Sequence, residues 1–229
     1  MLQLFFLDDI EHPELTGDNA HHAERVLRMS VGEELLVSDG RGKWAKCAIT
    51  LITKKYVQLK VIQAGEETAN PIQISVLQAI PKNDRAKETV ELLTASGVSK
   101  IYPWQAQRAI GKDSDKWEVA AIEASKQSRR FNIPEVMPKL NTNEAINLFG
   151  QYEQILICHE SAKNQISDVV KLASKTLIVI GPEGGITESE LELFEQAGAK
   201  VIKLGRPVLR SAHAGIAAVS AVSALMKVW

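Results

Sequence analysis

Cysteine and long apolar runs are both scarce in this chain of 229 residues. Its two cysteines, Cys47 and Cys158, lie far apart and outside any CxxC pair, which disfavours a disulfide framework and a structural zinc site. This usage fits a reducing cytoplasm, and no metal is expected. The longest small and apolar run, residues 214–226, falls short of the roughly 20 residues that span a bilayer. No basic region precedes the acidic residues Asp8 and Asp9, so we expect no signal peptide and no membrane association.

The chain also lacks an excess of charge of one sign, because it contains 27 Lys and Arg residues and 28 Asp and Glu residues. The charge is unevenly distributed, however, with net −3 in residues 1–70, zero in 71–98, +3 in 99–140 and −1 in 141–229. The basic side chains of the positive segment include Arg108, Lys112, Lys116, Lys126, Arg129 and Arg130. A solvated helix face and a binding site for a polyanion both explain this segment.

The first 65 or so residues have the pattern of β-structure. Val57, Leu59 and Val61 alternate with polar neighbours, which is the period-two pattern of a half-buried strand. Strands are expected over residues 35–37, 44–53 and 56–63, with a turn at 39–42, one short helix over 19–29 and a linker over 65–71.

After Pro71 the pattern changes to alternating strands and helices. Strands are expected over residues 72–80, 101–103, 152–158, 176–180 and 200–204. Helices are expected over residues 84–96, 117–131 and 165–173, after a capping box formed by Thr187 and Glu190, and from Ser211 onward with Ser211 as the cap. This alternation predicts an α/β domain with a mostly parallel sheet over residues 71–229, preceded by a small β domain over residues 1–70.

Three loops follow predicted strands of this sheet, at the edge where ligands bind in parallel sheets. They begin at Ile157, Ile180 and Leu204. The second loop is glycine-rich, but the sequence contains neither GxxxxGK[ST] nor GxGxxG, which disfavours a phosphate-binding loop and a Rossmann dinucleotide site. Backbone groups beside Glu183 suit a neutral heterocycle with a nearby cationic centre. A tight strand-to-helix turn without a ligand is an equally good explanation of this loop alone.

Small residues dominate the last helix, where six alanines, two serines and one glycine follow Ser211 within a few turns. Such residues allow close packing, either within the domain or between subunits, and a buried core helix is the simpler reading. His213 on this helix is expected to be a hydrogen-bonded packing residue rather than a catalytic base.

Several ordered motifs are spread along the chain. The second half contributes Ile180-Gly-Pro-Glu-Gly-Gly, Leu204-Gly-x-x-Val-Leu-Arg210 and the small-residue helix. The other motifs are His22-Ala23-x-x-Val26-Leu27-Arg28 with Gly32 and Asp39-Gly40, Pro81-Lys82-x-Asp84-Arg85, Gly97-Val98, Pro103, Arg108, Gln127-Ser128-Arg129-Arg130 and Pro134-Glu135. Together these motifs resemble the RsmE family of the SPOUT class of RNA methyltransferases, and the resemblance covers nearly the whole chain.

The resemblance implies a PUA-like β-barrel that binds RNA, followed by a SPOUT-type parallel sheet with a C-terminal trefoil knot. It implies a homodimer through the knot region and methylation of N3 of a uridine in small-subunit (16S) ribosomal RNA, on the assembled subunit. It also implies that S-adenosylmethionine is bound by the three loops. The corresponding residues are Cys158, His159, Glu160, Ile180, Gly181, Pro182, Glu183, Gly184, Gly185, Leu204, Gly205, Val208 and Leu209.

Two arginines are the candidates for stabilising a uridylate anion, first Arg210 and then Arg108. A salt bridge that fixes the knot is the structural alternative for Arg210. Arg28, Lys82, Arg85, Arg129 and Arg130 are the candidates for contacts with RNA phosphates. Glu160 and Glu183 are possible general bases, and the sequence does not choose between them.

The sequence departs from many family members after the last strand. They have Leu-Arg-Thr-Glu-Thr-Ala where this chain has Leu209-Arg210-Ser211-Ala212-His213-Ala214, which weakens any mechanism that uses that glutamate as a base. The chain also lacks an Arg just before Phe5. Three alternatives stay open: another SPOUT enzyme that methylates a ribose 2′-hydroxyl or a guanine, a non-catalytic RNA-binding assembly factor, and a metabolic α/β enzyme.

Overall fold

A computed structural model describes residues 2–68, 70–111 and 114–228, apart from the side chains of Asn83 and Asp84. Lys112 of the basic segment lies outside the described residues. The chain forms two compact units, one of Met1–Ala69 with Ser125–Ile133 and one of Asn70–Ala124 with Pro134–Trp229. The predicted division at residue 70 gives no sign that residues 125–133 return to the first unit.

The first unit is a curled five-stranded sheet with the strand order β1-β3-β4-β5-β2. Its strands are β1 (Leu4–Phe6), β2 (Glu14–Thr16), β3 (Glu34–Ser38), β4 (Lys43–Ile52) and β5 (Tyr56–Glu66). The pair β1 and β3 is parallel, and the other pairs are antiparallel. Shifts of register between β4 and β5 mark bulges, which increase the twist of a sheet and help it curl.

Inward-facing residues of these strands, among them Leu35, Val37 and Val57, form the core of the first unit. The helical segments α1 (Gly17–His21) and η1 (His22–Val26, a π-helix) add Ala20 and Ala23 to this core. The returning segment 125–133 joins the unit through Phe131, whose ring stacks on Trp44 at a centroid distance of 5.5 Å. The backbone of Phe131 also accepts a hydrogen bond from the N–H of Gly42.

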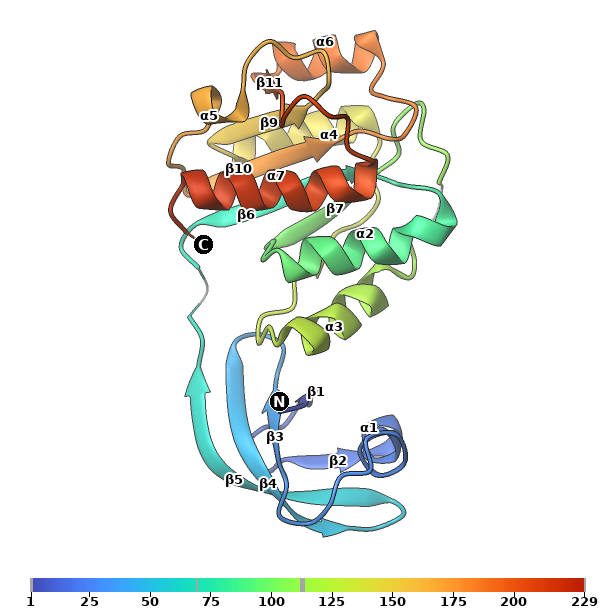
Figure 1. Ribbon diagram of the computed structural model, residues 1–229, viewed down its shortest axis with the longest axis vertical. Coiled ribbons are helices and arrows are strands. Elements are labelled where there is room, and N and C mark those ends of the chain that lie inside the picture. Colours follow the sequence, from blue (N-terminus) through green and yellow to red (C-terminus); the bar gives the residue numbers. More distant parts are fainter. Residues whose placement is uncertain (1, 69, 112–113, 229) are drawn as a thin grey trace. The chain divides into compact units, whose positions relative to one another are not determined.

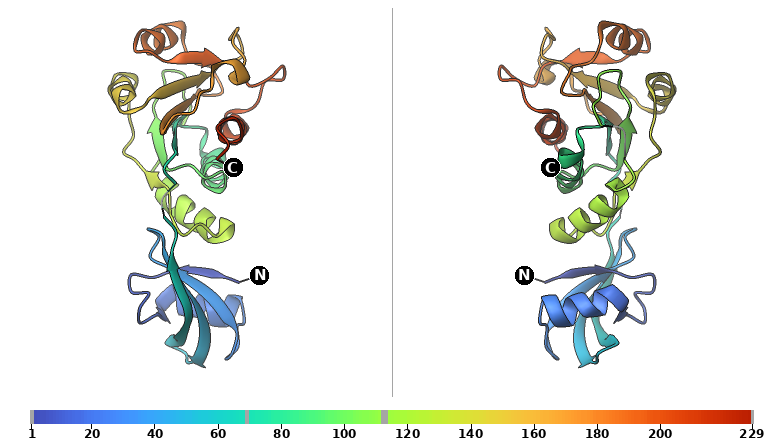
Figure 2. Two further views of the ribbon diagram at one scale, coloured as in Figure 1. Left: turned by 90° about the vertical axis from the view of Figure 1, so that its left-hand side faces the viewer. Right: turned by 90° about the vertical axis from the view of Figure 1, so that its right-hand side faces the viewer.

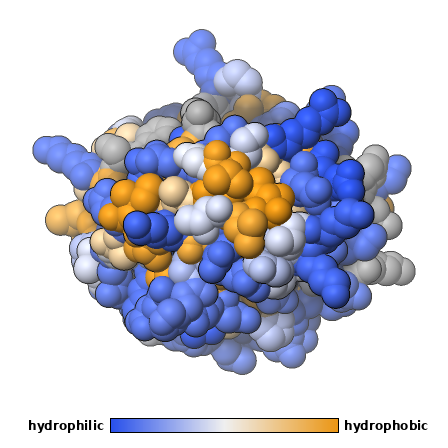
Figure 3. Space-filling view, turned by 90° about the horizontal axis from the view of Figure 1, so that it is seen from below, coloured by the Kyte–Doolittle hydropathy of each residue, from blue (hydrophilic) through white to orange (hydrophobic). Residues whose placement is uncertain are grey.

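Apolar side chains are grouped among hydrophilic ones on the face of the first unit seen in Figure 3. The large apolar side chains that this unit exposes are Val26, Val31, Leu51 and Ile62. The unit therefore exposes apolar and polar side chains together.

The second unit is a six-stranded sheet with the order β11-β9-β10-β6-β7-β8, and all its strand pairs are parallel. This confirms the predicted α/β class. The strands are β6 (Gln73–Ala79), β7 (Lys100–Trp104), β8 (Glu135–Val136), β9 (Gln154–Cys158), β10 (Lys175–Ile180) and β11 (Lys200–Ile202). The helices are α2 (Asn83–Ala95), α3 (Trp117–Ser128), α4 (Thr142–Leu148), the 3-10 helix η2 (Phe149–Gln151), α5 (Ile166–Val169), α6 (Glu188–Gln196) and α7 (Ser211–Leu225).

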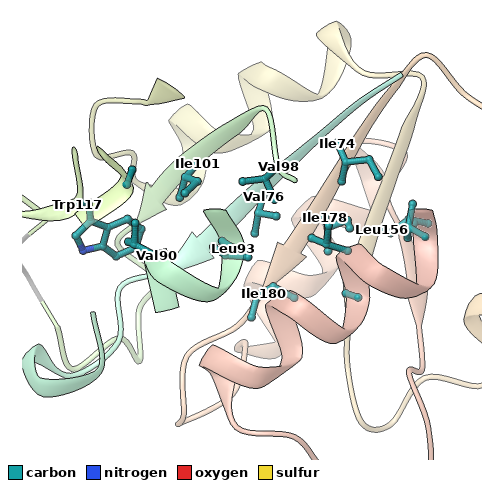
Figure 4. Packing of buried hydrophobic residues seen from close by; sticks show 14 of the residues in the cluster. Ile74, Val76, Val90, Leu93, Val98, Ile101, Trp117, Leu156, Ile178 and Ile180 are labelled. Atoms are coloured by element: carbon teal, nitrogen blue, oxygen red, sulfur yellow. The ribbon is translucent and has the colours of Figure 1, made fainter. Parts of the chain in front are cut away.

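Both faces of this sheet are covered, which explains why β10 is apolar from Leu177 to Ile180. Ile178 and Ile180 pack on one side with α2, α3, α5 and α7, whereas Leu177 and Val179 pack on the other with α4 and α6. Figures 1 and 2 show the two helical layers, and Figure 4 shows residues of α2, β6 and β10 meeting in the first core. Helix α7 contacts α2 closely, and a Cβ at Gly215 would lie 2.9 Å from the Leu93 side chain. The small residues of α7 thus permit close packing within the unit.

The structure corrects several predicted boundaries. The strand β5 extends through Glu66 into the predicted linker, because Gly65 pairs with Trp44 across the sheet. The helix α3 ends at Ser128 rather than 131, and α5 spans only four residues of the predicted 165–173. Ser211 does not cap the last helix, because Arg210 occupies the N-cap position without a side-chain bond. The predicted trefoil knot stays a prediction.

No described helix is long and apolar enough to cross a membrane. Within the described ranges, no group of three or more His, Cys, Asp or Glu side chains could hold a metal ion.

Candidate active site

The site is built where three adjacent parallel strands end. Cys158, the last residue of β9, pairs with Ile180 of β10 on one side and with Ile202 of β11 on the other. Because these strands are parallel, the loops that follow them leave from one edge of the sheet. A cavity of about 1190 Å³ opens among these loops.

Most of the predicted cofactor residues line this cavity. They are Cys158, His159, Glu160, Ile180, Gly181, Pro182, Glu183, Gly184, Gly185, Val208 and Leu209. The other two, Leu204 and Gly205, line a neighbouring cavity of about 80 Å³ that shares several of the same walls. The structure therefore brings the three predicted loops together, while their roles toward a cofactor stay predictions.

The loop between β10 and α6 depends on its glycines. A Cβ at Gly181 would lie 2.7 Å from the Ile186 side chain, so this position has no room for a larger residue. Gly185 has a φ of +77°, which glycine adopts without strain, and its N–H donates to the carbonyl of Pro182 at 2.9 Å. The loop ends at the capping box of Thr187 and Glu190, which the sequence predicts correctly. The result is a tight turn whose backbone faces the cavity.

Ser211 joins this loop to the rest of the sheet. Its hydroxyl donates to the carbonyl oxygen of Gly181 at 2.8 Å and accepts from the Nε2 of Gln78 at 2.9 Å. All three residues come from different elements: Gln78 lies in β6, Gly181 follows β10 and Ser211 begins α7. The serine expected to cap a helix instead fixes the first residue of the glycine loop.

Two arginine side chains reach the cavity, and they are the two candidates for stabilising an anion. The Nη1 of Arg108 donates to the carbonyl oxygen of Gly184 at 3.2 Å. Arg210 lines the cavity and is exposed, and its side chain forms no ion pair with any described residue. The alternative of a structural salt bridge for Arg210 thus finds no support among these residues.

Acidic and thiol groups complete the walls. The carboxylate side chains of Glu160, Glu183 and Glu188 line the cavity, and all three residues are exposed. Burial raises the pKa of the Cys158 thiol to about 12, so this thiol stays protonated near neutral pH and is a poor nucleophile. The Nδ1 of His159 accepts a hydrogen bond from the N–H of Ser161 at 3.3 Å.

The predicted RNA-binding residues fall in both units. Arg28, Arg129 and Arg130 belong to the first unit, whereas Lys82 and Arg85 belong to the second. Arg28 and Lys82 are exposed, and Arg85, Arg129 and Arg130 are half-buried.

Three of these arginines have an unusual backbone conformation or environment. Arg28 and Arg129 have positive φ angles of 54° and 55°, a conformation that non-glycine residues adopt rarely. Burial lowers the pKa of the Arg130 guanidinium, and the nearby Glu67 opposes this shift.

The prediction that His213 is a packing residue is wrong. Its side chain is half exposed, and its Nε2 lies 3.7 Å from a carboxylate oxygen of Glu88. It therefore belongs to the surface of α7 rather than to its packed face.

Sequence reasoning missed part of the cavity wall. Ile186, Glu188, Ser189, Leu191, Ser211 and Ala214 also line it. Most of them lie in the first turns of α6 and α7. Both helices begin directly after a predicted ligand loop, so the sequence could have indicated that their first residues lie beside the ligand.

The fold and the cavity define the class: an α/β domain with a ligand site at the strand ends, preceded by a small curled β unit. A family of RNA methyltransferase domains matches residues 68–223, and a family of RNA methyltransferase PUA domains matches residues 15–62. The chain belongs to the RsmE family, the ribosomal RNA small subunit methyltransferases E.

Relatives and a solved structure agree with this assignment. Ribosomal RNA small subunit methyltransferase E of Mycobacterium bovis is 30% identical to this chain, and the match covers 99% of this chain and 93% of the relative. The protein of the same name from Bacillus subtilis is also 30% identical, over 91% and 88%. A crystal structure of ribosomal RNA small subunit methyltransferase E from Neisseria gonorrhoeae, bound to S-adenosyl methionine, is similar with a TM-score of 0.88 at 26% identity, over 98% of both chains.

Proposed function

We propose that this chain transfers a methyl group from S-adenosylmethionine to N3 of a uridine in 16S ribosomal RNA, on the assembled small subunit. The observation that carries this proposal is the meeting of two arginine side chains, Arg108 and Arg210, with a glycine loop at one cavity. Membership of the RsmE family supplies the substrate class. The cavity supplies a place for both the cofactor and a reacting base.

The residues of the cavity fit S-adenosylmethionine. The cavity volume, about 1190 Å³, exceeds what a ligand of this size needs and leaves room for a second group. Gly181 and Gly184 line the cavity, and their backbone groups can hydrogen-bond the edge of a flat adenine. Glu160 and Glu183 bring carboxylates to the cavity wall, and such groups would stabilise a sulfonium bound beside them. When bound, the cofactor supplies an activated methyl group on that sulfonium.

The protein must make the uracil nitrogen nucleophilic. N3 of uridine carries a proton, and the anion left by its departure spreads over N3, O2 and O4. Guanidinium groups that are already in place stabilise such an anion without reorganisation. Arg210, which forms no ion pair with a described residue, takes this role first, and Arg108 supports it.

The proton of N3 needs an acceptor other than the glutamate found in many family members. Position 212, where they carry it, is a buried alanine here. Three carboxylates line the cavity, those of Glu160, Glu183 and Glu188, and Glu160 and Glu183 are the bases that we propose. Each must come within hydrogen-bond reach of N3 in the bound complex.

RNA binding is assigned to basic side chains in both units. Arg28, Lys82, Arg85, Arg129 and Arg130 supply contacts to phosphates, which provide most of the affinity of a protein for RNA. The first unit, which matches a PUA domain, also exposes apolar side chains that can contact unpaired bases.

We further propose that two copies of the chain associate through α7 in the knot region. Ala217, Ala221 and Ala224 lie three to four residues apart on this helix, and none of them is buried. A row of small side chains on one face allows a second helix to approach closely. The free thiols of Cys47 and Cys158 fit a protein that works in the reducing cytoplasm.

Two measurements test the proposal together. Calorimetry with S-adenosylmethionine tests the cofactor, and transfer of a labelled methyl group to small subunits that lack the modification tests the reaction. We expect binding, and transfer to assembled subunits in preference to naked RNA. Binding to RNA without any affinity for S-adenosylmethionine would instead indicate a non-catalytic assembly factor.

A further inference from the structure

Glu190 is fully buried, although it is a glutamate on an outer helix. It is the third residue of α6, and its Oε2 accepts from the N–H of Thr187 at 3.1 Å and from the Thr187 hydroxyl at 2.9 Å. These bonds complete a capping box, which satisfies N–H groups at the start of a helix. They use only one of the two carboxylate oxygens.

The other oxygen serves a different part of the chain. The Oε1 of Glu190 accepts from the backbone N–H of Gln107 at 2.9 Å and from the hydroxyl of Thr142 at 2.9 Å. The hydroxyl of Thr142 in turn accepts from the Nε1 of Trp104 at 3.2 Å. A capping box has no need of these contacts, so they point to a second task for this carboxylate.

A second capping box in the same unit provides a comparison. At the start of α4, Glu144 bonds the N–H of Asn141 through Oε2 at 2.8 Å, as Glu190 bonds Thr187. Glu144 is exposed, and its carboxylate makes no hydrogen bond to the described residues around Gln107. Burial and the long-range bonds therefore distinguish Glu190 from a glutamate that only caps a helix.

The residue after Gln107 is Arg108, whose guanidinium reaches Gly184 in the cavity. Gln107 and Arg108 are the central residues of a turn closed by a bond from the N–H of Ala109 to the carbonyl of Ala106 at 3.0 Å. Ala106 and Ala109, at the ends of this turn, pack in the core beside α6, whereas the side chain of Gln107 in its middle is exposed. The bond from the Gln107 N–H to the Glu190 carboxylate ties the middle of the turn to α6.

We propose that Glu190 is a positioning residue that sets the place of Arg108 in the cavity. The inference rests on the proposed function only where it concerns methyl transfer. A carboxylate can accept all four bonds, whereas the amide of a glutamine has one oxygen for the two backbone N–H groups of Thr187 and Gln107. Glu190 thus links the start of α6, which follows the glycine loop, to the arginine that touches the same loop.

The test uses Glu190→Ala and Glu190→Gln, with Glu144→Ala and Glu144→Gln as matched controls that disturb a capping box alone. Amide hydrogen exchange of residues 105–109 is the first readout, and it needs no methyl acceptor. We expect exchange there to become at least about tenfold faster in Glu190→Ala, because an amide without its bond is open to water. The Glu144 variants should leave this segment unchanged. Unchanged exchange in a folded Glu190→Ala protein would overturn the proposal.

The second readout separates positioning from general stability. We expect Glu190→Ala to lower kcat by about 10- to 100-fold with a smaller effect on KM, since a displaced catalytic group mainly reduces turnover. In a protein that already carries Arg108→Ala, Glu190→Ala should cause no further loss of kcat. Losses that multiply in the double variant would contradict action through Arg108.

Glu190→Gln keeps the test decisive if Glu190→Ala does not fold. Hydrogen exchange shows whether its one oxygen still holds Gln107 or Thr187. Loss of the Gln107 bond should come with loss of turnover, and loss of the Thr187 bond alone should not. Full turnover after loss of the Gln107 bond, or lost turnover after loss of the Thr187 bond alone, counts against the proposal. If the unaltered protein transfers no methyl group, the proposed function fails, while the exchange data still decide whether Glu190 holds the Arg108 turn.

Discussion

Arg108 donates a hydrogen bond to the carbonyl oxygen of Gly184 at 3.2 Å, although the two residues are 76 positions apart in the chain. A Cβ on Gly184 would lie 3.1 Å from the Cβ of Arg108, so the two backbones approach closely as well. This contact places a cation from the segment after β7 against the glycine loop after β10. It connects a residue proposed to stabilise the substrate to the loop proposed to hold the cofactor.

Gly184→Ala should disturb this contact. The added methyl group overpacks the Arg108 backbone, and overpacking of this kind costs about 1–3 kcal/mol. We expect weaker binding of S-adenosylmethionine by calorimetry and methyl transfer reduced about tenfold or more. Gly150→Ala is the matched control, because nothing lies within 4 Å of a Cβ at that position. Equal cofactor affinity and equal rates of methyl transfer in the two variants would show that the close approach of Gly184 to Arg108 does not matter for either.

Arg210→Ala should reduce turnover much more than cofactor binding. Removal of one preorganised group that stabilises developing negative charge lowers kcat by about 100- to 1000-fold. Because Arg210 is exposed and forms no ion pair with a described residue, the melting temperature should hardly change. Rates of methyl transfer to small subunits, with calorimetry for the cofactor, check this. Full activity in Arg210→Ala would remove the residue from the reaction.

Ser211→Ala should destabilise the second unit and loosen the glycine loop. The hydroxyl is buried and connects Gly181 to Gln78, so its loss leaves both partners without this bond, at a cost of about 1–3 kcal/mol. Urea unfolding measures the change. In Ser167→Ala the lost hydroxyl is exposed and, among the described residues, bonds Asp168 alone, so that control should stay within about 0.5 kcal/mol of the unaltered protein. A Ser211→Ala protein as stable as this control would contradict the role of the serine.

Stability should fall at alkaline pH in part because of Cys158. Its pKa is raised to about 12 in the folded protein, from 9.0 for an ordinary thiol. Above pH 9 the unfolded chain therefore loses a proton that the folded chain keeps, so stability decreases as pH rises from 9 towards 12. Between pH 8 and pH 10 this thiol should account for a loss of about 1.4 kcal/mol. In Cys158→Ala the free energy of unfolding, measured with urea, should fall by that much less between pH 8 and pH 10. An identical fall in both proteins would show that the pKa of this thiol is not raised in the folded state.

Local patterns were enough to predict much of the second unit. The apolar run of β10 and the capping box of Thr187 and Glu190 both appear where the sequence places them. The three ligand loops could be predicted because parallel strands end at one edge. Contacts between distant segments carry no such signal. The bond from Gln107 to Glu190 spans 83 positions, and the stacking of Phe131 on Trp44 brings residues 125–133 into the first unit. Neither pairing leaves a local pattern in the residues that make it.

The identity of the methylated nucleoside tests the central claim most directly. Small subunits that lack the modification are incubated with the protein and labelled S-adenosylmethionine, and the RNA is then digested to nucleosides and analysed by mass spectrometry. The account predicts that the label appears in 3-methyluridine, with far less of it when Arg210→Ala replaces the unaltered protein. Label in a ribose-methylated nucleoside or in a methylguanosine would contradict it.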